Sequence, residues 1–177
     1  MALPHFETER LFVRPRTMGD FEACLAMDRD PEVTQFIPGP WHDHPRHEAF
    51  LRDRIETSYG NIFGYWSLFP KANPRTFAGW VFLIQQEGVG SEIEIGWRLN
   101  RSAWGNGFAT EAVCPIIKHA FRSEEVNRII ADIDPRNLSS LRVAAKIGMK
   151  RIGQGEHGDD RYALIKTAFI SETCQVD

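Results

Sequence analysis

The chain has no long apolar run, few cysteines and no surplus of positive charge. No stretch is apolar enough to span a bilayer, and the first ten residues lack the basic and apolar segments of an export signal. We therefore expect neither membrane insertion nor export. Three cysteines without a C-x-x-C spacing argue against a disulfide framework and a zinc ribbon, and they favour reduced thiols in a cytoplasm.

The balance of charged and apolar residues predicts an ordinary globular domain. A net charge of −3 gives no indication of a nucleic-acid partner. The hydrophobic share of 42% and the charged share of 25% are typical of chains that bury a core. A length of 177 residues fits one domain, so we expect a single domain over 1–177 with a core of about 8–170.

The apolar periodicity predicts a fold of class α+β. Period-two alternation and turn signals predict strands at 11–15, 65–69, 76–84, 91–99, 128–134, 150–152 and 161–165. Helical spacing predicts helices at 19–29, 46–59, 109–121 and 138–147, with a loop at 38–45. Short turns between the three middle strands imply an antiparallel meander. We expect one mixed, mostly antiparallel sheet flanked by about four helices.

A glycine-bracketed turn, residues 104–111, lies between the strand at 91–99 and the helix that follows. The first N–H groups of a helix have no partner within it, and together with the helix dipole they suit an anion. Gly105 and Gly107 permit a positive φ and a close approach of phosphate. For an isolated G-x-G, a tight turn whose glycines serve only geometry is the favoured interpretation.

Several motifs occur in an order and spacing found together in one enzyme superfamily. They are Thr8-Glu9-Arg10-Leu11 with Arg14-Pro15, Glu94-Ile95-Gly96-Trp97, Trp104-Gly105-Asn106-Gly107-Phe108-Ala109-Thr110-Glu111-Ala112, Asn137-Leu138-Ser139-Ser140-Leu141-Arg142 and Lys146-Ile147-Gly148-Met149. Nearly the whole chain resembles the GNAT superfamily of acyl-CoA-dependent N-acetyltransferases, and more narrowly the RimJ/RimL type that acetylates ribosomal-protein N-termini. Ser102 and Met149 depart from the family pattern, but neither changes the backbone of the turn.

The resemblance implies a binding site for acetyl-CoA as cosubstrate. It assigns the pyrophosphate to backbone donors of the turn and the pantetheine arm to the free backbone of a splayed strand, with an asparagine side chain beside that arm. The residues implied are Trp97, Arg98, Leu99, Trp104, Gly105, Asn106, Gly107, Phe108, Ala109, Thr110, Asn137 and Ser140.

Two side chains are candidates for catalysis. Glu94 is the candidate base that takes the proton of the amine, and Glu92 shares its face. The alternatives for Glu94 are a solvated strand glutamate and recognition of substrate charge without proton transfer. Ser140 resembles the serine of the family's Asn-x-x-Ser, whose hydroxyl lies near the sulfur. Its alternative is structural, since Asn137 or Ser139 would cap the helix.

The histidines His42, His44 and His47 have ligand-like chemistry but lack a fourth partner, so no metal site is expected. A share in the acceptor pocket is the alternative for this loop. No cysteine has an evident activating partner, which argues against a covalent enzyme intermediate.

The predicted function is acetyl transfer from acetyl-CoA to a primary amine by direct attack, the acceptor being a protein N-terminus or a small amine. The alternative is a non-catalytic acyl-CoA-binding or interaction module on the same fold. No nucleic-acid or membrane partner is expected, and the sequence leaves a monomer and a homodimer open.

Overall fold

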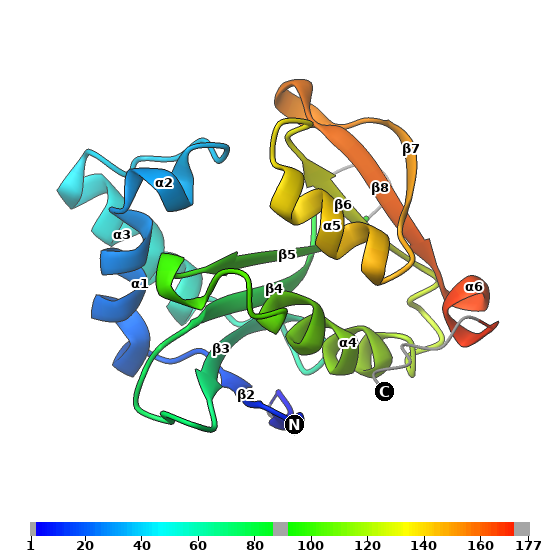
Figure 1. The fold of residues 1–177 in the computed structure, drawn as a ribbon, viewed down its shortest axis with the longest axis horizontal. Coiled ribbons are helices and arrows are strands. Elements are labelled where there is room, and N and C mark those ends of the chain that lie inside the picture. The colour runs from blue at the N-terminus through cyan, green and yellow to red at the C-terminus, as the bar shows by residue number, and fades with distance from the viewer. Residues whose placement is uncertain (1–2, 87–91, 172–177) are drawn as a thin grey trace.

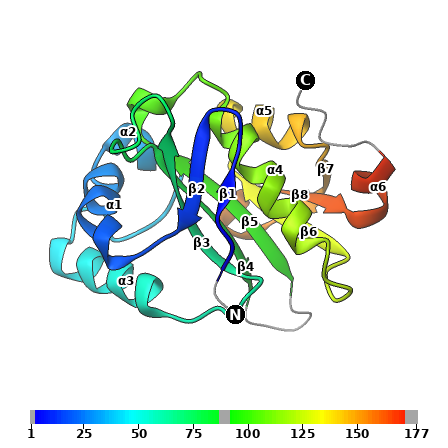
Figure 2. The same ribbon diagram turned by 90° about the horizontal axis from the view of Figure 1, so that it is seen from below.

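The fold is built on one twisted sheet with helices on both faces (Figures 1 and 2). The computed structural model describes residues 3–86 and 92–171. Within these residues the sheet has eight strands: β1 (Phe6–Glu7), β2 (Leu11–Pro15), β3 (Gly64–Pro70), β4 (Gly79–Gln85), β5 (Ile93–Leu99), β6 (Arg128–Ile133), β7 (Lys150–Gln154) and β8 (Asp160–Ile165). The helices are α1 (Phe21–Asp28), α2 (Pro31–Thr34), α3 (His44–Glu56), α4 (Phe108–Ala120), α5 (Leu138–Lys146) and α6 (Lys166–Ser171).

The strand order is β1-β2-β3-β4-β5-β6-β8-β7. Every neighbouring pair is antiparallel except β5 and β6, which run parallel. The predicted α+β class, the mostly antiparallel mixed sheet and the meander of β3, β4 and β5 are therefore confirmed. The one parallel pair divides the sheet into two halves, and α4 connects its two strands.

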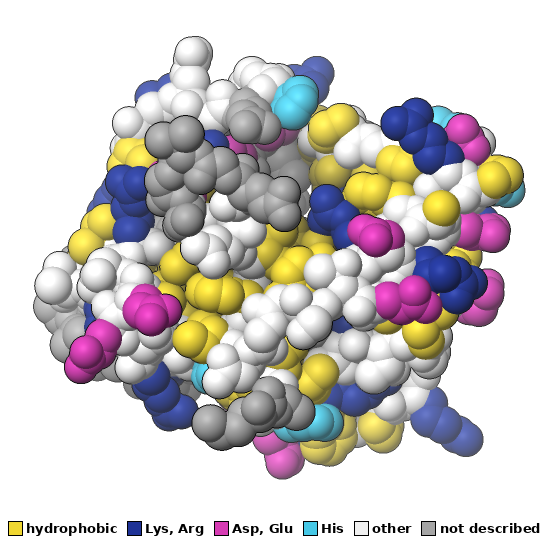
Figure 3. All heavy atoms as spheres, turned by 180° about the vertical axis from the view of Figure 1, so that it is seen from behind, with side chains coloured by type: hydrophobic (Ala, Val, Ile, Leu, Met, Phe, Trp, Pro, Cys, Tyr) yellow, Lys and Arg dark blue, Asp and Glu magenta, His cyan; other side chains and the backbone are white. Residues whose placement is uncertain are grey.

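Alternating side chains give the sheet two different cores. Trp66 and Leu83 belong to a cluster that contains the buried residues of α4, whereas Tyr65 and Trp80 belong to one that contains those of α1 and Leu51 of α3. Figure 2 shows α1 and α3 on one side of the strands and α4 on the other. Seen from behind, hydrophobic side chains form a band across the middle of the molecule between charged side chains (Figure 3).

The structure corrects the predicted helices at two prolines. The helix expected at 19–29 ends before Pro31, but Pro31 itself occupies the first turn of a further short helix, α2, with Asp30 as N-cap. Pro45 was placed in a loop, but α3 begins at His44 with Pro45 in its first turn and Asp43 as N-cap. A helix tolerates proline in its first turn because the N–H there has no partner to lose. The short α2 and α6 also raise the helix number above the expected four.

The strand expected at 76–84 begins only at Gly79. Just before it, the side-chain amide of Asn100 donates to the carbonyl of Phe77, and the Asn100 N–H donates to that of Ala78. The expected turn at 87–90 and Cys174 lie outside the described residues. Across 3–86 and 92–171, none of the helices has the length and apolar character needed to cross a membrane.

Candidate active site

The site lies where β5 and β6 diverge. The two parallel strands pair at Glu94 and Ile130, and no further register pair continues toward the end of β5. Residues of β5 beyond Glu94 remain paired with β4 on the other side. The sequence prediction required such a splay, because backbone groups at 97–99 become available to an extended ligand only if β6 leaves β5.

The turn after β5 has the backbone geometry that an anion needs. Gly105 and Gly107 have φ values of 75° and 76°, a region that L residues rarely adopt. A Cβ on Gly105 would meet no atom within 4 Å, so the space beside it is open. Gly107 precedes Phe108, the first residue of α4, and the first helical bond runs from the N–H of Glu111 to the carbonyl of Gly107. The N–H groups of the first turn are therefore directed out of the helix.

Side chains hold this turn against the end of β5. The amide of Asn106 donates to the carbonyls of Ala103 and Trp104, at 3.2 and 3.1 Å. The indole of Trp104 donates to the carbonyl of Leu99 at 2.9 Å. Of the three residues predicted to offer backbone groups, Leu99 thus already has its carbonyl engaged. The contact fixes the turn relative to the strand before it.

The buried Glu111 connects the first turn of α4 to the N-terminal hairpin. Its carboxylate accepts from the Thr8 hydroxyl at 2.6 Å and from the Arg10 backbone at 2.7 Å, and it pairs with the Arg10 guanidinium. Burial by itself raises the pKa of Glu111, but these hydrogen bonds outweigh it and leave the pKa below its ordinary value. Two motifs that the sequence shows far apart therefore form a single structural unit.

Asn137 and Ser140 lie at the start of α5. The Asn137 side chain accepts from the Ser140 N–H at 3.1 Å, so the asparagine is the helix cap. The Ser140 hydroxyl oxygen lies 3.3 Å from the indole nitrogen of Trp97, which donates to it from β5. The capping interpretation of Asn137 is confirmed, and the Ser140 side chain links α5 to β5.

Glu94 is not a solvated strand glutamate. It is partly buried, and its carboxylate accepts from the Gln86 amide at 2.8 Å. Burial raises the pKa of Glu94, with a further rise from Asp132. Glu92, the other candidate on this face, instead forms ion pairs with Arg128 and Arg161. These contacts favour Glu94 as the group that exchanges a proton.

A cavity of about 380 Å³ brings several predicted residues together. Those that line it are Glu94, Trp97, Arg98, Asn137 and Ser140. Its other walls include aromatic side chains, namely Phe36, Trp41, Phe50, Tyr65, Trp80 and Phe82. Leu99 and the turn at 104–110 are not part of the lining. The site therefore has two parts, a glycine turn and a cavity, joined by the last residues of β5.

A buried ion pair that was not predicted from the sequence borders this cavity. Arg98 pairs with Asp28 at 2.6 Å, and its guanidinium lies over the rings of Trp41 and Trp80. His47 contacts the same aspartate at 3.2 Å. The alternation of β5 placed Arg98 on the polar face, but no local pattern linked it to the end of α1. Of the three histidines considered, only His47 is buried, whereas His42 and His44 are exposed.

Cys24 is buried, and burial raises the pKa of its thiol to about 12. A thiol in this setting stays protonated near neutral pH. Among the described residues, no group of three or more His, Cys, Asp or Glu side chains is arranged to hold a metal ion.

Comparison with known proteins identifies the family. Residues 10–150 match the model of the acetyltransferase (GNAT) domain. The chain is 30% identical over 148 residues to "Uncharacterized N-acetyltransferase p20" of Bacillus licheniformis, covering 82% of each chain.

The fold is shared with solved structures. An acetyltransferase from Agrobacterium tumefaciens superposes with a TM-score of 0.78 at 23% identity, covering 93% of this chain and 95% of that one. A spermidine N-acetyltransferase from Vibrio cholerae, solved with CoA and spermine, gives 0.72 at 14% identity and covers 90% and 98%. With residues 10–150 matched and the GNAT fold present, the chain belongs to the GNAT family and is an acetyltransferase.

Proposed function

We propose that this enzyme transfers acetyl from acetyl-CoA to a primary amine by direct attack, with Glu94 as base and Ser140 beside the sulfur. One observation carries the proposal: Glu94 from β5 and Ser140 from α5 line the same cavity, at the divergence of β5 and β6. An acyl donor that enters through the divergence would meet an acceptor that occupies the cavity.

The turn at 104–110 fits the pyrophosphate of coenzyme A. Its two glycines have left-handed backbone conformations, the space at Gly105 is open, and the first N–H groups of α4 point outward. The backbone of Trp97 and Arg98, with the Asn137 side chain, would hold the pantetheine arm. When bound, acetyl-CoA supplies an acetyl group activated as a thioester.

Glu94 would accept the proton of the amine, and Ser140 would donate a hydrogen bond to the leaving thiolate. The attacking amine must be neutral, which an α-amino group with a pKa of about 7.7–8.0 reaches more readily than a lysine. A carboxylate with a raised pKa is a better proton acceptor than an ordinary one, and Glu94 has this property. Because the Ser140 oxygen already accepts from Trp97, its own hydrogen is available to the departing thiolate.

The high pKa of Cys24 supports direct transfer over a route through this thiol. The acceptor class proposed from the RimJ/RimL resemblance is a peptide N-terminus, with a small amine as the alternative. The cytoplasmic location and a homodimer remain proposals that rest on the sequence alone.

The test is an acceptor panel. Release of free thiol from acetyl-CoA would be followed with N-terminal peptides, amino acids and polyamines, together with a thermal shift on addition of coenzyme A. We expect a shift with coenzyme A and turnover with at least one amine. The absence of any thermal shift with coenzyme A would refute the proposed donor. A clear thermal shift without turnover of any acceptor would favour the binding-module alternative.

A further inference from the structure

Within the part of the chain that the structure describes, two arginines at one end of the cavity have no acidic partner. Arg16 is only 9% exposed, and among the described residues neither it nor Arg54 forms an ion pair with a carboxylate. The Nε of Arg16 is buried without a hydrogen-bond partner. A buried cation without an anion is costly, and burial lowers the pKa of Arg16. An anion placed beside these two side chains would remove much of that cost.

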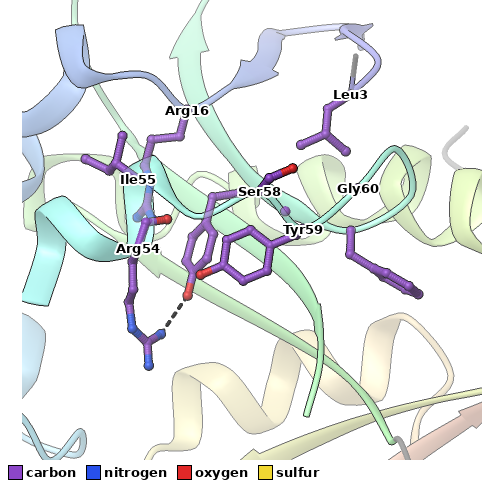
Figure 4. Close-up of a pocket in the computed structure, with 10 residues that line it drawn as sticks. Leu3, Arg16, Arg54, Ile55, Ser58, Tyr59 and Gly60 are labelled. Carbon is purple, nitrogen blue, oxygen red and sulfur yellow. Dashed lines mark hydrogen bonds between the residues drawn. The ribbon is translucent and has the colours of Figure 1, made fainter. Parts of the chain in front are cut away.

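Neighbouring groups hold both guanidiniums in place. Arg16 donates to the carbonyl of Arg54 at 3.2 Å and lies over the ring of Tyr65, 3.7 Å from its centroid. Arg54 donates to the Tyr65 hydroxyl at 2.6 Å, the contact drawn as a dashed line in Figure 4. Figure 4 shows the pair on the wall of a smaller pocket, of about 130 Å³, which shares Arg16, Arg54 and Tyr65 with the main cavity. The two cations thus belong to a preformed, aromatic-backed site.

The proposed base lies further along the same cavity. Tyr65, Phe82 and Gly96 are register partners across β3, β4 and β5, so the outer two lie about 10 Å apart. Glu94 lies on the same face of β5, two residues before Gly96. The ring of Phe82 covers Gly96, where a Cβ would come within 2.4 Å of it. An apolar floor therefore separates the arginines from Glu94, although Arg54 still contributes to keeping Glu94 ionised.

The other charges of the cavity wall are largely compensated. Arg98 pairs with Asp28, Asp132 with Arg161, and Asp134 with Arg136. The pKa of Asp159 is raised by burial and by neighbouring aspartates, and this group lies toward the β6 side with Asp132 and Asp134. The cavity therefore has an uncompensated cationic end at Arg16 and Arg54, and an acidic end that includes Glu94.

We propose that the acceptor is an amine that also carries a carboxylate, separated from the amine by an apolar segment. The carboxylate would bind Arg54, with Arg16 behind it, while the amine would meet Glu94. Guanidinium groups are well suited to carboxylates because they donate two parallel hydrogen bonds. The inference rests on the proposed function, and it names the acceptor class of the same site. The source is either a free aminocarboxylate or a peptide whose acidic side chain lies close to its N-terminus.

The experiment compares matched acceptors. Initial rates with acetyl-CoA would be measured for γ-aminobutyrate against butylamine, ε-aminocaproate against hexylamine, and a peptide that begins Ala-Glu against one that begins Ala-Gln. We expect kcat/KM to be at least about tenfold higher for the acidic member of one of these pairs, as the loss of a charged hydrogen bond predicts. A preference among the free amines identifies the small-molecule source, and a preference confined to the peptides identifies the other.

The Arg54→Gln variant tests the assigned group. In this variant the ratio of kcat/KM between the acidic and the neutral acceptor should fall toward one, because KM for the acidic acceptor rises while kcat is unchanged. Arg54→Lys should restore part of that ratio. Arg52→Gln is the matched control, since Arg52 lies on the same helix, is exposed, and contacts Glu56 and Phe21 instead. A thermal shift with coenzyme A would show that each variant is folded.

Two outcomes would overturn the inference while leaving the proposed function intact. One is turnover with equal kcat/KM for both members of every pair. The other is a preference for polyamines such as spermidine, which the cationic end should disfavour. Failure of the proposed function itself looks different, because no acceptor would then be acetylated.

Discussion

The indole nitrogen of Trp97 donates a hydrogen bond to the hydroxyl oxygen of Ser140 across 3.3 Å, and so links β5 to α5. The contact lies beside the divergence of β5 and β6, through which the proposed acyl donor would enter. Since a hydroxyl that accepts one hydrogen bond still has its own hydrogen to donate, this contact leaves the Ser140 hydrogen available for the sulfur of the proposed donor.

This geometry predicts distinct effects for two substitutions. Ser140→Ala should lower kcat about tenfold to 100-fold, because the departing thiolate loses a donor. Trp97→Phe should lower kcat less, since the hydroxyl remains but is no longer oriented. Steady-state kinetics with saturating acetyl-CoA would measure both, with Ser139→Ala as the control, because Ser139 is exposed and does not line the cavity. Equal rates for Ser140→Ala and wild type would refute the assigned role.

Glu94→Gln should lower kcat/KM by about 100-fold or more at neutral pH, as the loss of a general base predicts. In the wild type, kcat/KM should fall as the pH drops through the raised pKa of Glu94, which lies above the ordinary 4.5. The Glu94→Gln variant should not show this fall of kcat/KM at acidic pH. The pH profile of Glu92→Gln should keep this fall in kcat/KM, because Glu92 is held in ion pairs with Arg128 and Arg161 and is not the proposed base. Loss of activity in Glu92→Gln alone would reverse the assignment.

The same substitution should not destabilise the fold. A carboxyl whose folded pKa is raised contributes stability that is present below its unfolded pKa and lost as the pH rises through the folded value. At neutral pH the ionised Glu94 is thus unfavourable, and the amide oxygen of the variant would still accept from Gln86. We expect the Tm of Glu94→Gln at pH 7 to equal or exceed that of the wild type, with any advantage disappearing in acid. A clearly lower Tm at pH 7 would contradict this.

Gly105→Ala should weaken coenzyme A binding about tenfold. The methyl group would occupy the open space beside the turn, and a φ of 75° costs an L residue about 1–2 kcal/mol. Gly153→Ala is the control, since that site is also open and has no positive φ. Binding would be measured by calorimetry. Unchanged affinity in Gly105→Ala would remove the turn from the proposed site.

Asp28→Asn should cost about 3–5 kcal/mol of unfolding free energy, because it leaves the buried Arg98 without its anion. Glu32→Gln provides a matched exposed pair with Arg101 and should cost no more than about 1 kcal/mol. Urea unfolding would measure both. A small effect for Asp28→Asn would mean that the two tryptophan faces, or water, compensate the guanidinium.

The sequence predicted those parts of the site that depend on local backbone and periodicity. The alternation of β5 placed Glu94 and Trp97 on opposite faces, and the two glycines before α4 identified a turn with positive φ. It could not resolve the choice between Glu92 and Glu94, because that choice depends on Arg128, Arg161 and Gln86 from other segments.

The charged residues of the proposed acceptor cavity could not be predicted from the sequence either, because their partners also come from distant segments. Arg98 is 70 residues from Asp28, and nothing near either residue signals the ion pair. Arg16 and Arg54 look like ordinary surface charges until the fold brings both against Tyr65. Pro45 shows the reverse error: it was assigned to a loop but lies in the first turn of α3, because proline is common both at the start of a helix and just beyond the end of one.

The contact between Thr8 and Glu111 spans 103 residues of chain. Because Glu111 lies in the first turn of α4, the N-terminal hairpin anchors the turn that we propose binds the pyrophosphate. During synthesis the hairpin cannot form these contacts until Glu111 has left the ribosome, so a nascent chain that ends before Glu111 lacks this anchor for its N-terminal strands.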